Sequence, residues 1–120
     1  MSVYVKESAK DMAEGLSNME TAMILDYNSK FMHRNDEVSA QMRAEYAQGF
    51  EVTFGSKYIK VLEKNGGVRA FIVNTDKDKK FKMGDILKPA GWAAPARNKA
   101  RGNILDGGYA INWTGPLYLK

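Results

Sequence analysis

Apolar residues recur every three or four positions before residue 50 and alternate with polar residues after it. The chain therefore changes there from helical to strand periodicity. Two apolar stripes, over 9–16 and 19–31, predict the first helices. Gly15 can adopt the left-handed conformation that ends a helix, and a capping box at Ser17–Glu20 can begin the next one. We therefore expect a helix boundary between the two stripes.

A third helical stripe runs over 38–46. Asn35 or Asp36 would cap this helix at its start, and Gly49 would close it. The only histidine, His33, stands just before this cap, and no second metal ligand lies at coordination spacing around it. We expect His33 to be a solvated residue near the end of the second helix.

Strand periodicity begins over 50–54 and continues in two segments, 57–64 and 67–74, on either side of Asn65-Gly66. This dipeptide favours a two-residue hairpin loop. A loop one residue later would bring two cations directly opposite each other, so we prefer the first register. The expected pairs are Glu63 with Val68, Leu62 with Arg69, Val61 with Ala70, Lys60 with Phe71, Ile59 with Ile72 and Tyr58 with Val73.

The remaining strands are shorter. Residues 81–88 predict a bent strand or strand pair with a turn or bulge at Gly84-Asp85. Alternation resumes over 109–114, Gly115-Pro116 is expected to turn the chain, and 117–119 would form a last strand. Helices followed by strands indicate an α+β fold.

We expect one domain over residues 1–120, with a helical subregion at 1–49 and a β subregion at 50–120. Two or three helices would pack on a small antiparallel sheet of five or six strands, rolled into an SH3-like half-barrel. The predicted core consists of Met23, Leu25, Met42, Val52, Phe54, Ile59, Val61, Phe71, Ile72, Ile86, Ile111 and Trp113.

Composition excludes several kinds of chemistry. The 120 residues contain no cysteine, which excludes disulfides, thiolate metal sites and cysteine nucleophiles. Phosphate-binding glycine motifs and a nucleophile elbow are absent from the sequence. Asp76 and Asp78 have the spacing of calcium ligands, but the next ligand position holds Lys80, so residues 75–80 predict a solvated turn. We therefore expect no bound metal, no cofactor and no enzymatic activity; a carboxylate pair of Asp85 and Asp106 is the catalytic alternative.

Charge divides the chain into two halves. Residues 1–55 carry 5 basic and 9 acidic side chains, whereas residues 56–120 carry 13 basic and 5 acidic ones. This asymmetry indicates an anionic partner for the C-terminal half. It equally suits attraction between the two halves, within one chain or between two copies.

The long basic loop at 89–108, together with Lys88 just before it, carries the candidate binding residues. It is too long for a hairpin loop and too rich in small residues for a periodic helix, although one helical turn is expected near 96–100. Its cations can neutralise phosphates, its amides can donate hydrogen bonds, and its tryptophan offers a stacking face. The candidate site consists of Lys88, Trp92, Arg97, Asn98, Lys99, Arg101 and Asn103.

Five short motifs stand out within residues 81–119: Gly84-Asp85, Trp92, Pro95-Ala96, Arg101-Gly102-Asn103 and Trp113-Thr114-Gly115. With them, this stretch resembles a C-terminal segment of small uncharacterised accessory proteins of tailed bacteriophages, and residues 17–28 are similar to short phage helices. The resemblance implies a setting, the bacterial host cytoplasm or the virion. It assigns no catalytic residue.

These observations predict a non-enzymatic accessory protein that binds nucleic acid or an acidic host partner through the basic loop. Two alternatives stay open: a virion structural or homo-oligomeric interaction protein, and an inhibitor of a host or defence protein. We expect no membrane partner, because the sequence shows no membrane-spanning apolar run and no signal peptide.

Overall fold

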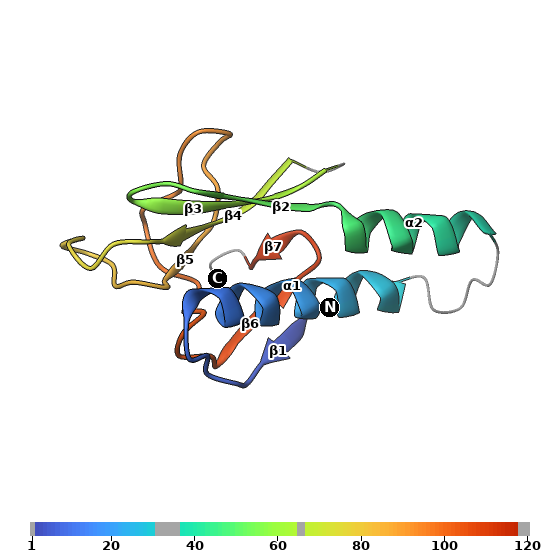
Figure 1. The fold of residues 1–120 in the computed structure, drawn as a ribbon, viewed down its shortest axis with the longest axis horizontal. Helices are drawn as coiled ribbons and strands as arrows, with labels where there is room; N and C mark the ends of the chain where they lie inside the picture. Colours follow the sequence, from blue (N-terminus) through green and yellow to red (C-terminus); the bar gives the residue numbers. More distant parts are fainter. Residues whose placement is uncertain (1, 31–36, 65–66, 118–120) are drawn as a thin grey trace.

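The computed structural model describes residues 2–30, 37–64 and 67–117 (Figure 1). A short strand, β1 (Val3–Val5), precedes the helices α1 (Met12–Lys30) and α2 (Glu37–Gln48). The later strands are β2 (Phe50–Phe54), β3 (Tyr58–Glu63), β4 (Gly67–Val73), β5 (Ile86–Leu87), β6 (Tyr109–Asn112) and β7 (Gly115–Pro116). The predicted α+β class is confirmed. The expected caps at Asn35 or Asp36, the single histidine His33, the Asn65-Gly66 loop and the end of the strand at 117–119 lie outside the described residues.

Helix α1 runs without a break through Gly15 and Ser17, so the predicted boundary there is wrong. Gly15 is an interior position of the helix that packs against Ile104 of the long loop, and the helix has its cap at Asp11. The Asp11 side chain accepts a hydrogen bond from the Glu14 backbone N–H at 2.9 Å, and the Glu14 carboxylate accepts one from the Lys10 N–H at 3.1 Å. The Asp11 bond satisfies the Glu14 N–H in the first turn of the helix, and the Glu14 bond holds the Lys10 N–H just before it, so α1 starts after Asp11.

The cap gives a direct test. Asp11→Ala should lower the free energy of unfolding by about 1 kcal/mol, because the Glu14 N–H loses its acceptor. Ser17→Ala, at an exposed position inside the same helix, should leave it unchanged or raise it slightly. Urea denaturation followed by circular dichroism measures both variants. A larger loss for Ser17→Ala would contradict a helix start at Asp11.

The strands form two antiparallel sheets, β1-β6-β7 and β2-β3-β4-β5, where the sequence predicted one sheet of five or six strands. Strand β1 pairs with β6, from Val3 opposite Ile111 to Val5 opposite Tyr109. A three-residue strand whose partner lies near the other end of the sequence leaves no local pattern to detect. Gly115-Pro116 is itself a strand that pairs with β6 and not the predicted turn.

The predicted hairpin register is confirmed over 58–61, which pair with 70–73. A bulge follows, and Arg69 is its extra residue, so the last two predicted pairs are wrong. The bulge lets the Arg69 guanidinium come within 3.9 Å of the buried Glu63 carboxylate, a compensation for burying that charge. The observed pairs are Leu62 with Val68 and Glu63 with Gly67.

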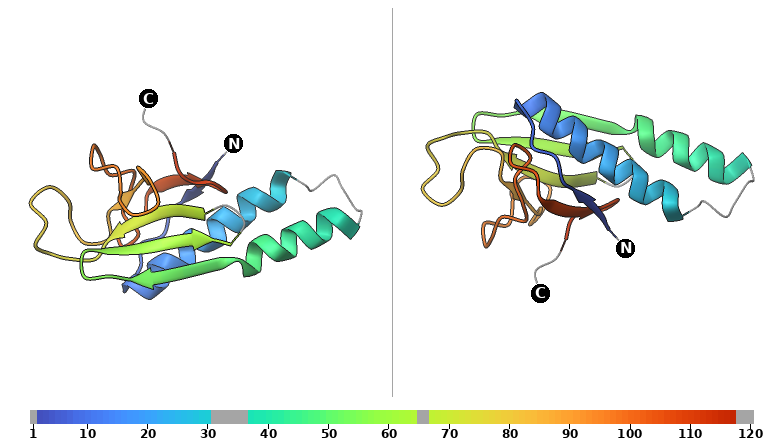
Figure 2. Two further views of the ribbon diagram at one scale, coloured as in Figure 1. Left: turned by 90° about the horizontal axis from the view of Figure 1, so that it is seen from above. Right: turned by 90° about the horizontal axis from the view of Figure 1, so that it is seen from below.

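Helix α1 lies across one face of the four-stranded sheet and also contacts β1 and β6, so the main core joins α1 with both sheets (Figures 1 and 2). The prediction of burial is wrong for two core candidates, Leu25 and Phe54. Leu25 is 56% exposed on the outward side of α1, and Phe54 is 64% exposed at the outermost strand of the sheet. The predicted core residues that are buried are Met23, Ile59, Val61, Phe71, Ile72, Ile86 and Ile111, whereas Met42, Val52 and Trp113 are partly buried.

The opposite face of the four-stranded sheet has a smaller core of its own. Phe71, Val73, Phe81 and Leu87 are buried there, and Ala100 of the long loop packs against them. Part of this loop rises over the face opposite α1 (Figure 1). The predicted helical turn at 96–100 is absent from this segment. Within the described ranges, no helix is both long and apolar enough to cross a membrane.

Candidate functional site

Three segments meet at one end of the four-stranded sheet and line an open pocket of about 570 Å³. They are the turn between β2 and β3, the loop at 74–80 and the long loop. The first two are held together because the Asn74 N–H donates to the Lys57 carbonyl oxygen at 2.7 Å. The lining residues are Ser56, Lys57, Thr75, Lys77, Asp78, Lys79 and Arg97.

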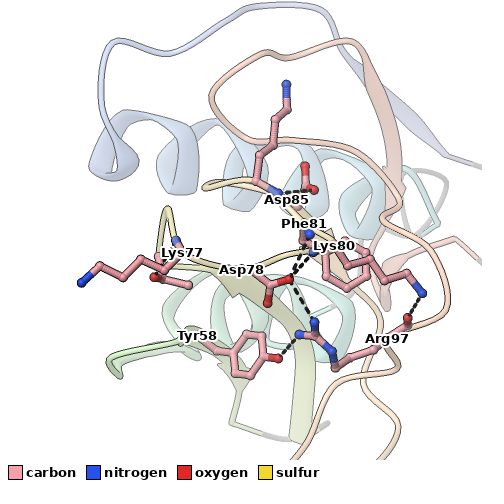
Figure 3. A network of polar contacts seen from close by, with 9 residues as sticks. Tyr58, Lys77, Asp78, Lys80, Phe81, Asp85 and Arg97 are labelled. Atoms are coloured by element: carbon pink, nitrogen blue, oxygen red, sulfur yellow. Dashed lines mark hydrogen bonds and ion pairs between the residues drawn. The ribbon is translucent and has the colours of Figure 1, made fainter.

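Asp78 and Arg97 form the polar network that joins two of these segments (Figure 3). The Asp78 Oδ1 atom accepts hydrogen bonds from Arg97 Nη2 at 3.0 Å and from the backbone N–H groups of Lys80 and Phe81 at 2.8 and 3.0 Å. The other terminal nitrogen of Arg97 donates to the Tyr58 hydroxyl. The bond from Arg97, with the two backbone bonds, holds the pKa of Asp78 well below its ordinary value, so Asp78 is a carboxylate at neutral pH.

The pocket carries an excess of positive charge. Lys57, Lys77 and Lys79 are exposed, and within the described residues none of them forms an ion pair. Asp78 is the only acid among the described residues that line the pocket, and Arg97 already matches its charge. The three lysine charges therefore have no acidic counterpart within the lining itself, which favours an anionic ligand.

The outer face of β3 connects this pocket to an exposed tryptophan. Trp92 lies within a small hairpin at 89–95 and is 64% exposed. The Lys60 ammonium lies 4.6 Å from the centre of the Trp92 ring. Lys60 and Tyr58 are alternate residues of β3 and so share a face, and Tyr58 binds Arg97. We call the surface made by Trp92, Lys60, Lys57, Lys77, Lys79 and Arg97 the basic strip.

The other predicted binding residues have different surroundings. Lys99 is exposed, and the Asn98 side chain accepts hydrogen bonds from the Lys99 N–H at 2.9 Å and from Arg101 Nη2 at 3.3 Å. The Lys88 ammonium donates to the Pro116 carbonyl oxygen at 2.9 Å. Burial, and then the neighbouring guanidinium groups, lower the pKa of Lys88. Asn98, Lys99, Arg101 and Lys88 all lie outside the lining of the basic pocket.

Asn103 is part of the interior. Its amide nitrogen donates to the Met83 carbonyl oxygen and to Asp85 Oδ1, both at 2.9 Å, and its Oδ1 accepts from the N–H groups of Leu105 and Asp106 at 2.8 and 3.0 Å. The residue is 6% exposed. These four bonds use its hydrogen-bonding capacity, so we remove Asn103 from the candidate site.

The two acids considered for catalysis are also engaged in structural contacts. Asp85 accepts hydrogen bonds from the Asn103 amide and from the Lys82 N–H at 3.0 Å. Asp106 is exposed and forms an ion pair with the Lys82 ammonium, which raises the pKa of Lys82. Neither carboxylate lines the basic pocket, so this geometry adds no support to the carboxylate-pair alternative.

Comparison with known proteins places the chain in a family. The sequence profile of a family of unknown function, DUF7717, matches residues 3–119. The chain belongs to this family. The comparison with curated proteins gives no match, and neither does the comparison with solved structures. The matched segment includes the whole basic strip of this DUF7717 protein, so the function must be argued from its residues.

The sequence predicts Trp92 and Arg97 as candidate binding residues, but its loop pattern does not point to Lys57, Lys77 and Lys79, which line the same surface. The signal was present in the hairpin register. Because Tyr58 pairs with Val73, the residue before β3 and the loop after β4 must lie at the same end of the sheet. The lysines of the predicted solvated turn at 75–80 therefore line the same pocket as Lys57.

Proposed function

We propose that this DUF7717 protein binds single-stranded nucleic acid through the basic strip and catalyses no reaction. The observation that supports this most is the cluster of three exposed lysines without an ion pair in the described chain, which two neighbouring segments bring to one pocket. Lysines that contact phosphates release bound counterions, and this release drives binding.

Trp92 supports a single strand rather than a duplex. Its ring is 64% exposed, and the lysine at its side, Lys60, adds a charge next to the stacking surface. Bases of a single strand are available to stack on an aromatic ring, whereas bases of a duplex are stacked on each other. A strand that crosses the β3 face would place a base on Trp92 and its phosphates near the pocket lysines.

Arg97 has a positioning role in this proposal. Its place in the basic loop predicts a contact with a phosphate or carboxylate, but its two terminal nitrogens are bonded to Asp78 and Tyr58. These bonds tie the long loop to the 74–80 loop and keep both at the pocket. The phosphate contacts are therefore assigned to Lys57, Lys77 and Lys79.

The test is fluorescence anisotropy of labelled single-stranded and double-stranded DNA and RNA at about 50 and 200 mM salt. The double variant Lys77→Gln with Lys79→Gln should weaken single-strand binding on the order of tenfold and lower the salt slope by about 1.4. Trp92→Ala should weaken it roughly fivefold or more through lost stacking. Lys6→Gln with Lys10→Gln removes the same charge at exposed positions outside the strip and should have little effect.

Two results would overturn this proposal. One is that the wild-type protein binds none of these nucleic acids at low salt. The other is that the control variant weakens binding as much as the pocket variant. Binding to an acidic peptide that Trp92→Ala leaves unchanged, with no nucleic-acid binding, would instead identify an acidic protein partner.

The resemblance of residues 81–119 to tailed-phage proteins supports an accessory role in phage infection, in the host cytoplasm or the virion, as part of the same proposal. We also propose that the two sheets together make an SH3-like half-barrel. Support comes from the contact between β7 and β4, where Gly115 lies so close to Arg69 that a β-carbon would be 2.3 Å from the Arg69 carbonyl oxygen.

A further inference from the structure

Strand β2 is the uncovered edge of the four-stranded sheet, and Figure 2 shows it along the border of the sheet. The other edge is covered, because Ile86 of β5 bonds to Gly102 and Arg101, in both cases at 2.8 Å. No described strand pairs with the outer side of β2. The strand also contains none of the devices that usually block an edge, such as a lysine, a proline or a bulge.

The hydrogen bonds at the ends of β2 show which backbone groups face outward. Gly49 and Gly55, at the two ends, are both bonded toward β3 and its extension. In an antiparallel pair, residues alternate between those that bond to the neighbour and those that do not. The N–H and C=O groups of Phe50, Val52 and Phe54 therefore point away from β3, toward the open edge.

We propose that β2 pairs with β2 of a second copy of this chain, antiparallel and centred on Val52, to form a symmetric dimer. In this register Val52 lies opposite Val52 of the second copy, and Phe50 lies opposite Phe54. Every one of these residues has outward backbone groups, so each pair can exchange both of its hydrogen bonds. The sheet then continues from one copy into the other.

Charge selects this register over its neighbours. Centred on Val52, the pairing places Glu51 opposite Thr53 of the second copy. Centred on Glu51, it would place two carboxylates directly opposite each other, which is unfavourable. Centred on Thr53, it would leave Phe50 without a partner. The strand is thus self-complementary in one register, which favours a second copy over an unrelated extended peptide.

The exposure of Phe54 also favours pairing with a second copy. Phe54 lies on the face of β2 that it shares with the core residue Ile59, because the two are register partners. Yet Phe54 is 64% exposed, since it lies at the edge of that face. In the dimer Phe50 of the second copy stands beside it, and aromatic cross-strand pairs stabilise a sheet. The proposal is independent of the nucleic-acid proposal, because no residue of β2 lines the basic pocket.

Two substitutions at one exposed position test the proposal. Thr53→Glu creates two opposed carboxylate pairs in the dimer and should raise its dissociation constant about tenfold. Thr53→Lys creates two opposite-charge pairs and should lower it. Sedimentation velocity over a concentration series measures both, and hydrogen exchange of the amides at 50, 52 and 54 should slow as the concentration rises.

Several outcomes would overturn the β2 dimer. The wild-type chain could stay monomeric up to about millimolar concentration. A dimer could form but respond equally to both Thr53 variants, which would place its interface elsewhere. Exchange at 50–54 could also be independent of concentration while a dimer forms. Thermal melts of both variants confirm that each is folded before its mass is interpreted.

Discussion

Asn103→Ala is expected to lower the free energy of unfolding by at least about 3 kcal/mol. The substitution removes four hydrogen bonds at a residue that is 6% exposed. It leaves the Met83 carbonyl oxygen and the Leu105 N–H without their partner in a part-buried site, and unsatisfied buried groups are costly. Chemical denaturation measured by circular dichroism, together with the thermal midpoint, gives the loss.

Asn98→Ala is the matched control for this prediction. Asn98 is an exposed asparagine of the same loop, so its replacement should change stability by less than about 0.5 kcal/mol. If Asn103→Ala left the stability unchanged but reduced nucleic-acid binding, Asn103 would be a ligand contact and its structural role would be contradicted.

Gly15→Ala should also destabilise the fold, by about 1–3 kcal/mol. Helix propensity alone predicts the opposite, a gain of about 1 kcal/mol. The difference is the contact of α1 with the long loop. A β-carbon at Gly15 would lie 2.8 Å from the Ile104 carbonyl oxygen and 3.0 Å from the Ile104 β-carbon, so helix and loop would have to separate. Urea denaturation determines the sign.

The control for Gly15 is the reverse substitution two positions earlier. Ala13 is exposed on the same helix, so Ala13→Gly should cost about 1 kcal/mol through propensity alone. A stability gain for Gly15→Ala, alongside this loss for Ala13→Gly, would show that the Ile104 contact is not needed.

The parts of the fold with a strong local pattern could be predicted. The alternation over 50–54 and the register of 58–61 with 70–73 follow from side-chain periodicity and from the exclusion of like charges opposite each other. The bulge at Arg69 could not be predicted, because it depends on the burial of the Glu63 carboxylate, which only the tertiary structure produces. The local sequence at Gly15 favours a helix end, because the residue that packs against it, Ile104, is far away in the sequence.

The residues of the candidate site also differ in how far the sequence alone could indicate them. Trp92 and Arg97 could be named as candidates because an aromatic residue and a cation in a long loop are visible in the sequence. The sequence predicts Asn103 as a binding residue, whereas its amide forms hydrogen bonds within the protein. The sequence alone does not distinguish an asparagine that binds a ligand from one that stabilises the fold. Lys77 and Lys79 become candidate binding residues only because Lys57 lines the same pocket. The hairpin register brings the two segments to the same end of the sheet.

The pairing of β1 with β6 determines when this protein can finish folding. Residues 3–5 are synthesised before their partners, Tyr109 to Ile111, and more than 100 residues separate the two strands. At about 5–20 residues per second, the N-terminal strand waits roughly 5–20 s for its neighbour. The helices and the β3–β4 hairpin have local partners and can form in that interval. Closure of the three-stranded sheet is therefore paced by translation and not by the search for local structure.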